Sequence, residues 1–196
     1  MGTVFSQYLG TLARLAAGIA CTDRAGRDLG GDPGFAAAVD LLAVAHRAGR
    51  TVHFVGNGGS AAIASHGAVD FFNAGMRSRA FNDGSLLTCL ANDFGYEEVF
   101  ARPLALVADP GDVLVAISSG GRSRNILAAV AAARERGCAV VTLSGFDADN
   151  PLRALGDVNF HVASHSYGFV ECLHQTICHG LFDCFLERVH GRPVPH

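Results

Sequence analysis

Short runs rich in β-branched residues alternate with alanine-rich helical stretches along most of this 196-residue chain. Alternation of this kind predicts parallel strands that are joined by right-handed helical crossovers. We therefore expect a three-layer α/β/α sandwich with a five-stranded parallel sheet. The expected strands are TVHFVG (51–56), SLLTCLA (85–91), DVLVAIS (112–118), CAVVTLS (138–144) and DVNFHVA (157–163).

Two helical stretches precede the first expected strand, and a long helix is expected at the end of the chain, over residues 168–190. We assign residues 1–34 to an N-terminal helical extension and residues 35–196 to the α/β domain. The apolar residues of the first stretch recur at helical spacing, which predicts an amphipathic helix. Helices of this kind often pack between subunits.

Composition excludes several classes of function. The chain has no Lys, which rules out a lysine Schiff base and a Walker-type phosphate loop. A net charge of −3 without a basic run argues against a nucleic-acid partner, and no apolar run is long enough to span a membrane. The six cysteines form no CxxC pair, and the N-terminus lacks a basic leader. We therefore expect a cytoplasmic protein with reduced thiols.

Two similar loops follow the first and third expected strands, namely GNGGS (56–60) and SSGGRS (118–123). Ligands of open parallel sheets bind beyond the carboxyl ends of the strands, and glycines at a helix N-terminus expose backbone N–H groups to anions. Turn formation and helix capping by Ser60 and Ser123 are the alternative explanation. Because both loops occupy corresponding strand ends, they favour a phosphorylated small molecule. Neither matches the dinucleotide fingerprint, so no nucleotide cofactor is expected.

Four side chains on two expected helices could supply acid–base or metal chemistry. His66 and Asp70 are four residues apart and therefore share one helix face. Glu171 and His179 are two turns apart on the last helix. A lone histidine on an apolar helix is more often a core or boundary residue. If the two helices face each other, however, this set could bind a divalent metal ion or transfer protons.

Together these motifs resemble the phosphoheptose isomerases, a family of sugar isomerase (SIS) domains. The segments that carry the resemblance occur in the family's order and approximate spacing, between about residues 35 and 187; they are GNGGSAA, LANDFGYEEVF, GDVLVAISSGGRSRN and VECLHQTICH. The resemblance implies that residues 35–196 form an SIS domain. It also implies a homotetramer with active sites between subunits.

The implied reaction is ketose–aldose isomerisation of a phosphorylated sugar, from sedoheptulose 7-phosphate to glycero-manno-heptose 7-phosphate through an enediol. The resemblance makes Asp70 and His179 the acid–base pair. It implies a Zn²⁺ site formed by His66, Asp70, Glu171 and His179. The implied substrate contacts are Asn57, Gly58, Gly59, Ser60, Asn92, Asp93, Ser118, Ser119, Ser123 and Glu171.

The chain departs from the family pattern inside this set. Asp70 replaces a glutamate, Glu171 replaces a glutamine, Gly120 replaces a serine and Arg122 replaces an asparagine. A shorter base matters, because a misplacement of ~1 Å can cost about a hundredfold in rate. Arg122 could replace the lost hydroxyl by a charge-assisted contact with phosphate.

Three alternatives to the phosphoheptose reaction stay open. The first is isomerisation of a longer ketose phosphate, such as octulose 8-phosphate, in natural-product biosynthesis. The second is a non-catalytic SIS-domain binding protein, and the third is a sugar-phosphate sensor.

Overall fold

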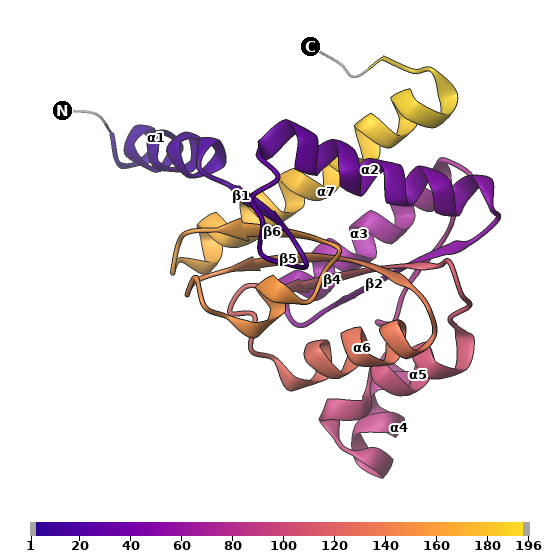
Figure 1. The fold of residues 1–196 in the computed structure, drawn as a ribbon. Helices are drawn as coiled ribbons and strands as arrows, with labels where there is room; N and C mark the ends of the chain where they lie inside the picture. Colours follow the sequence, from indigo (N-terminus) through magenta and orange to yellow (C-terminus); the bar gives the residue numbers. More distant parts are fainter. Residues whose placement is uncertain (1–2, 194–196) are drawn as a thin grey trace.

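The computed structural model describes residues 3–193 and consists of three layers, which Figure 1 shows. A six-stranded sheet of order β1-β6-β5-β4-β2-β3 forms the middle layer. The five strands from β6 to β3 run parallel, and β1 pairs antiparallel with β6 at the edge. The predicted α/β/α sandwich is confirmed. The strands are β1 (Ala20–Asp23), β2 (Thr51–Gly56), β3 (Arg77–Ala80), β4 (Val113–Ser118), β5 (Ala139–Gly145) and β6 (Val158–Val162).

Helices cover both faces of the sheet. One face carries α2, α3 and α7, the other carries α5 and α6, and α1 and α4 extend away from the body (Figure 1). Among residues 3–193, no helix is long and apolar enough to cross a membrane. The helices are α1 (Val4–Ala17), α2 (Gly31–Arg47), α3 (Gly59–Asn73), α4 (Gly84–Phe94), α5 (Ala101–Val107), α6 (Arg124–Glu135) and α7 (Tyr167–His190), with 3₁₀ turns η1 (Tyr96–Glu98) and η2 (Pro151–Ala154).

The sheet differs from the expected one in three strands. SLLTCLA (85–91) is helical, because the Asp83 side chain accepts a hydrogen bond from the backbone N–H of Leu86 at 2.9 Å and so caps α4. The fifth parallel strand is β3, whose Arg-Ser-Arg-Ala sequence lacks the apolar run of a buried strand. It was missed because it is an edge strand with alternately exposed side chains. The antiparallel strand β1 was also missed.

Part of the predicted extension joins the sheet. α1 has no buried residue, whereas β1 pairs with β6, and α2 begins at Gly31. The division between residues 34 and 35 stays a prediction, and residues 1–2 and 194–196 lie outside the described residues. All six cysteines are free thiols.

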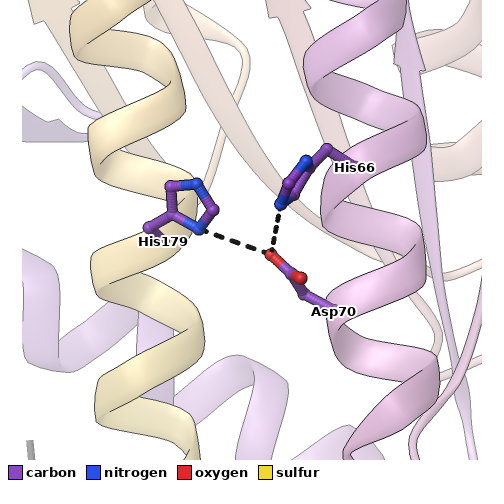
Figure 2. Close-up of side chains that lie close together, drawn as sticks. All are labelled: His66, Asp70 and His179. Carbon is purple, nitrogen blue, oxygen red and sulfur yellow. Dashed lines mark ion pairs between the residues drawn. The ribbon is translucent and has the colours of Figure 1, made fainter.

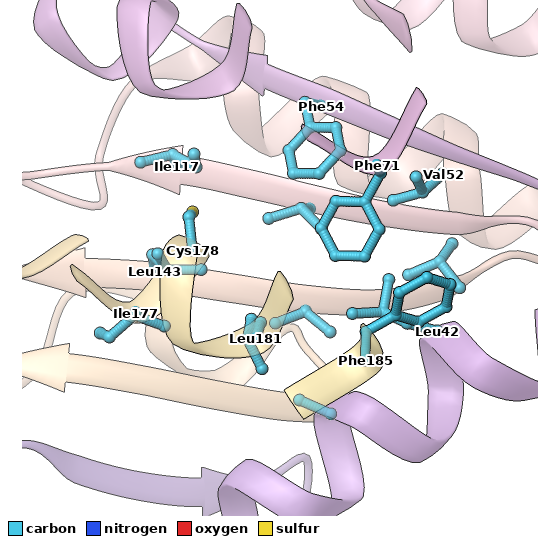
Figure 3. Packing of buried hydrophobic residues seen from close by; sticks show 14 of the residues in the cluster. Leu42, Val52, Phe54, Phe71, Ile117, Leu143, Ile177, Cys178, Leu181 and Phe185 are labelled. Atoms are coloured by element: carbon cyan, nitrogen blue, oxygen red, sulfur yellow. The ribbon is translucent and has the colours of Figure 1, made fainter. Parts of the chain in front are cut away.

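An aromatic cluster fixes α3 beside α7 on one face of the sheet (Figure 3). The ring of Phe71 lies 5.9 Å from that of Phe54 on β2 and 5.1 Å from that of Phe185 on α7, measured between centroids. Gly67 allows α3 to approach this closely, since a Cβ there would lie 2.9 Å from the Phe54 ring. The two helices are therefore held in one fixed relation.

A buried imidazole makes the stability of this fold depend on pH. His174 of α7 donates its Nε2–H to the carbonyl oxygen of Ser144 at 3.0 Å, and burial lowers its pKa to about 4. The unfolded chain binds this proton near pH 6.5, so folding becomes less favourable as the pH falls from 6.5 toward 4. We expect the free energy of unfolding to lose about 2 kcal/mol at this site between pH 7 and pH 5, measured by urea unfolding.

The matched variant is His174→Gln, which keeps an N–H donor but cannot titrate. Burial also lowers the pKa of His53 and of His161, so the variant should retain part of the pH dependence. The difference in slope between the two proteins isolates His174. Equal slopes would contradict the prediction, whatever the stability of the variant at pH 7.

Candidate active site

Two neighbouring helices bring three of the predicted side chains together (Figure 2). His66 Nε2 of α3 and His179 Nδ1 of α7 each lie 3.4 Å from Oδ2 of Asp70. The imidazole centroids are 4.8 Å apart, and one ligand atom from each residue lies within 4.8 Å of the others. The spacing of His66 and Asp70 predicts that they share one face of α3. This face contacts α7 at His179.

Gln175 orients this cluster, although the sequence analysis did not select it. Its side-chain amide Nε2 lies 2.9 Å from Nε2 of His179. The amide N–H can donate to this ring nitrogen and so hold the orientation of the imidazole. The signal in the sequence is the spacing, because Gln175 stands four residues before His179 and four after Glu171.

Two other titratable side chains of α7 are excluded from the chemistry. Burial, with a smaller effect of the Asp70 charge, raises the pKa of the Cys178 thiol to about 12. The thiol therefore stays protonated and serves as neither nucleophile nor thiolate ligand. His174 stays neutral, with its pKa lowered to about 4 by burial, and it holds the Ser144 carbonyl.

Both predicted phosphate loops line one cavity of about 240 Å³ at the carboxyl ends of β2 and β4. The hydroxyl of Ser119 is buried there and has no hydrogen-bond partner within residues 3–193, so it is available to a ligand. Larger hollows beside α2 and beside α4 contain neither loop. The lining residues are Asn57, Gly58, Gly59, Ser60, Ile117, Ser118, Ser119, Gly120, Ser123, Tyr167 and Glu171.

Helix capping does not account for the serine hydroxyls of these loops. The N-cap of α3 is Gly58, with a positive φ of 53°, so Ser60 lies inside the helix. Ser123 is the N-cap of α6, but its side chain makes no capping bond and its Oγ lies 3.3 Å from Oγ of Ser118. Helix capping therefore does not explain the hydroxyls of Ser60 and Ser123, and both residues line the cavity.

A pair of side-chain amides holds the first loop in place. Asn57 and Asn125 exchange two hydrogen bonds, of 2.9 and 2.8 Å, and the Tyr96 hydroxyl donates to Oδ1 of Asn57 at 3.1 Å. Asn125 is buried. The sequence analysis missed Asn125 and Tyr96 because their partner is distant along the chain, 68 residues away in the case of Asn125.

Asn92, Asp93 and Arg122 do not line the cavity of their own chain, whereas Glu171 lines it, as an implied substrate contact. Asn92 and Asp93 are exposed on α4, where Asn92 Nδ2 donates to Oδ1 of Asp93 at 2.9 Å, and neither lines the cavity. Arg122 donates to Asp149 at 2.8 Å instead of lining the cavity. The Glu171 carboxylate lies against Gly59 at the cavity and is not part of the His66, Asp70 and His179 cluster.

A row of polar side chains on α7 connects the cavity with the histidine cluster. Tyr167, Glu171, Gln175 and His179 follow one another at intervals of four residues, so neighbours in the row lie one turn apart and the row winds slowly around the helix. Tyr167 and Glu171 line the cavity, and His179 contacts Asp70. Since a helix rises 1.5 Å per residue, Glu171 and His179 are separated by about 12 Å along α7. The arrangement suits an elongated ligand.

Comparison with known proteins identifies the family of this chain. Residues 31–145 match the SIS domain family. The phosphoheptose isomerase of Geobacter sulfurreducens is 36% identical over 184 residues, which cover 90% of this chain and 96% of that protein. The phosphoheptose isomerase of Solidesulfovibrio magneticus is 39% identical over 150 residues, covering 73% and 72%.

A solved structure agrees as well. The phosphoheptose isomerase from Neisseria gonorrhoeae superposes with a TM-score of 0.74 and 32% identity, covering 78% of this chain and 85% of that one. Family match, overall identity and fold therefore coincide over most of the chain, which belongs to the SIS domain family and, within it, to the phosphoheptose isomerases.

Proposed function

We propose that this protein isomerises a phosphorylated long-chain ketose to the corresponding aldose, with sedoheptulose 7-phosphate and glycero-manno-heptose 7-phosphate as the pair. The observation that carries the proposal is the row of polar side chains on α7, which leads from the cavity lined by both loops to the cluster of His66, Asp70 and His179. A ligand that reaches both the cavity and the cluster must extend along more than one turn of α7, which suits a long-chain sugar phosphate.

The cavity end supplies hydrogen-bond donors for the phosphate. We assign the phosphate to the loop after β4, where the hydroxyls of Ser118, Ser119 and Ser123 gather. The N-terminus of α6 follows this loop and adds partial positive charge. The contacts to the sugar chain are then assigned to the loop after β2, at Asn57, Gly58, Gly59 and Ser60.

The cluster end carries the proton transfers. Asp70 takes the proton from C1 of the ketose and returns it to C2, while His179 moves a proton between the two neighbouring oxygens, through an enediol. Both imidazoles approach Oδ2 of Asp70, so Oδ1 is free of both and can face the carbon-bound proton. Proximity of base and proton is the main geometric requirement for this step.

The same cluster fits a divalent metal ion. Two imidazoles and a carboxylate with mutually close ligand atoms form a donor set that Zn²⁺ accepts, and we assign the ion to His66, Asp70 and His179. Glu171 is the further ligand that the resemblance suggests. When bound, the ion would polarise the oxygens of the substrate and favour the enediol.

We also infer a cytoplasmic homotetramer. Apolar side chains of α1 and α5 are exposed in the single chain, among them Phe5, Leu9 and Leu106. Large exposed apolar side chains of this kind favour association between subunits. Asn92 and Asp93, which lie outside the cavity of their own chain, would then serve an active site completed by a neighbouring subunit.

The reaction is tested by proton NMR of sedoheptulose 7-phosphate in D₂O. We expect deuterium uptake at the exchanging carbon together with formation of the aldose. Asp70→Asn keeps the shape of the side chain but removes the base, so kcat should fall by about 10²–10⁴. The control is Asp40→Asn on α2, which removes only a surface ion pair with Arg188 and should leave kcat within about twofold.

The outcome also separates the alternatives. Absence of both deuterium uptake and aldose would refute the heptose reaction, and octulose 8-phosphate is then the substrate to try. If the Asp70→Asn variant turned over the substrate at the wild-type rate, Asp70 would not be the base. Binding of either sugar phosphate without any exchange would point to a sensor or a binding protein.

Metal binding is tested apart from activity, by equilibrium dialysis with Zn²⁺ alone. We expect about one ion per chain, and His66→Ala and His179→Ala should each weaken binding at least tenfold because each removes a ligand. His165→Ala is the control, since this exposed imidazole pairs with Asp147 at 3.0 Å outside the cluster. Equal Zn²⁺ affinity in all four proteins would exclude this site.

A further inference from the structure

The loop after β5 packs against the serine loop, which comprises residues 118–123. The backbone N–H of Gly145, at the end of β5, donates to the carbonyl oxygen of Ser119 at 2.9 Å. A Cβ at Gly121 would overlap the side chain of Asn150, so the two loops are in close contact there as well. The positions of the serine hydroxyls at the cavity therefore depend on the loop after β5.

The first residue of the loop after β5 has a strained backbone. Phe146 lies in the left-handed region with a φ of 57°, and among residues 3–193 it is the one residue other than glycine with a positive φ. A residue with a bulky side chain rarely adopts this conformation, because its Cβ crowds the following carbonyl oxygen. Such strain persists only where the surrounding contacts impose it, and it is concentrated at functional sites.

Hydrogen bonds on both sides hold Phe146 in this conformation. Its own backbone N–H donates to the carbonyl oxygen of Ser164, in the loop after β6, at 3.0 Å. The buried side-chain amide of Asn150 donates to the carbonyl oxygens of Gly145 and Asp147, at 3.1 and 2.8 Å. These two carbonyl groups flank the strained residue, so the turn is fixed before and after it.

The ring of Phe146 contacts two walls of the cavity from behind. It faces the serine loop at Gly120, where a Cβ would lie 3.6 Å from the ring, in ordinary van der Waals contact. It meets the ring of Tyr167 edge to face, with 5.0 Å between the centroids, and it stacks on His165 at 5.6 Å. Gly120 and Tyr167 line the cavity, whereas Phe146 does not, so the ring acts through these two residues.

We propose that Phe146 is a positioning residue, which holds the serine loop and Tyr167 in the arrangement that binds the phosphate of the ligand. The inference rests on the proposed function, because that function assigns the phosphate to the serine hydroxyls of this loop. Without the ring, the space behind Gly120 and Tyr167 is empty and both walls can shift. Hydrogen bonds weaken steeply outside their distance and angle range, so a loop that is not held in place binds phosphate more weakly.

The test is calorimetric titration of the full chain with sedoheptulose 7-phosphate and, separately, with inorganic phosphate. Phe146→Gly and Phe146→Ala both remove the ring, but only glycine adopts the left-handed turn without strain. Both variants should bind either ligand about tenfold more weakly, because the ring and not the strain holds the loop. In steady-state kinetics KM should rise by about the same factor, while kcat changes by less than about threefold.

Two further variants serve as the rescue and the control. Phe146→Tyr keeps the ring and should bind both ligands within about twofold of the wild type. Phe169→Ala removes a ring from the first turn of α7 that stacks on Tyr8 at 4.4 Å, outside the cavity, and should leave both affinities unchanged. Circular dichroism and gel filtration establish that each variant keeps the wild-type fold and oligomeric state.

Thermal unfolding separates positioning from a merely structural role. Phe146→Ala should unfold at a lower temperature than Phe146→Gly, because alanine bears the backbone strain. Equal loss of affinity in these two variants, despite their different stability, would support the role of the ring. Lower unfolding temperatures with unchanged affinities would overturn the proposal, and so would a loss of affinity in Phe146→Ala alone.

The results also distinguish this inference from the proposed function, because the binding measurements do not require turnover. If the wild type binds sedoheptulose 7-phosphate without isomerising it, the proposed reaction fails, while weaker binding by the ring-deletion variants still supports the role of Phe146. If the wild type isomerises the sugar and the ring-deletion variants bind it equally well, the role of Phe146 alone fails.

Discussion

The packing of Phe71 between Phe54 and Phe185 is the interaction on which the site depends most. It joins α3 to a central strand and to α7 at once, and Gly67 lets α3 settle on the Phe54 ring. All side chains of the histidine cluster, and the Glu171 and Gly59 contact, lie on these two helices. A small rotation of either helix would separate these side chains. The close-packed aromatic core resists such a rotation. The aromatic core therefore fixes the relative positions of the polar side chains on α3 and α7.

Much of this could be predicted from the sequence where a local pattern decides the outcome. Buried central strands such as Val113–Ser118 show as apolar runs, and the four-residue spacing of His66 and Asp70 fixes their common face. Local sequence patterns fail to predict a strand or helix whose formation depends on a neighbouring residue or strand. The Arg77–Ala80 strand exists because β2 offers it an edge, and residues 85–91 are helical because Asp83 caps them. Neither fact is visible in the composition of the segment itself.

The site shows the same division between local and distant information. Glycine and serine loops after strands predict an anion cavity, and the structure places both loops at one cavity. The amide pair of Asn57 and Asn125 could not be anticipated, because it joins residues 68 positions apart that carry no shared local signal. Arg122 shows how a neighbour can engage a charge. Its charge suggests a phosphate contact, and its guanidinium donates to Asp149 at 2.8 Å. Charge indicates a class of partner, and geometry selects which one.

Two of the four departures from the family pattern, Asp70 and Glu171, are best considered together. Glu171 lines the cavity, and Asp70 of α3 contacts His179, which lies two turns further along α7. Asp70 has two imidazoles at one oxygen, whereas Glu171 has only the start of α3 to offset its charge. The two carboxyl groups therefore differ in how far their neighbours offset a negative charge.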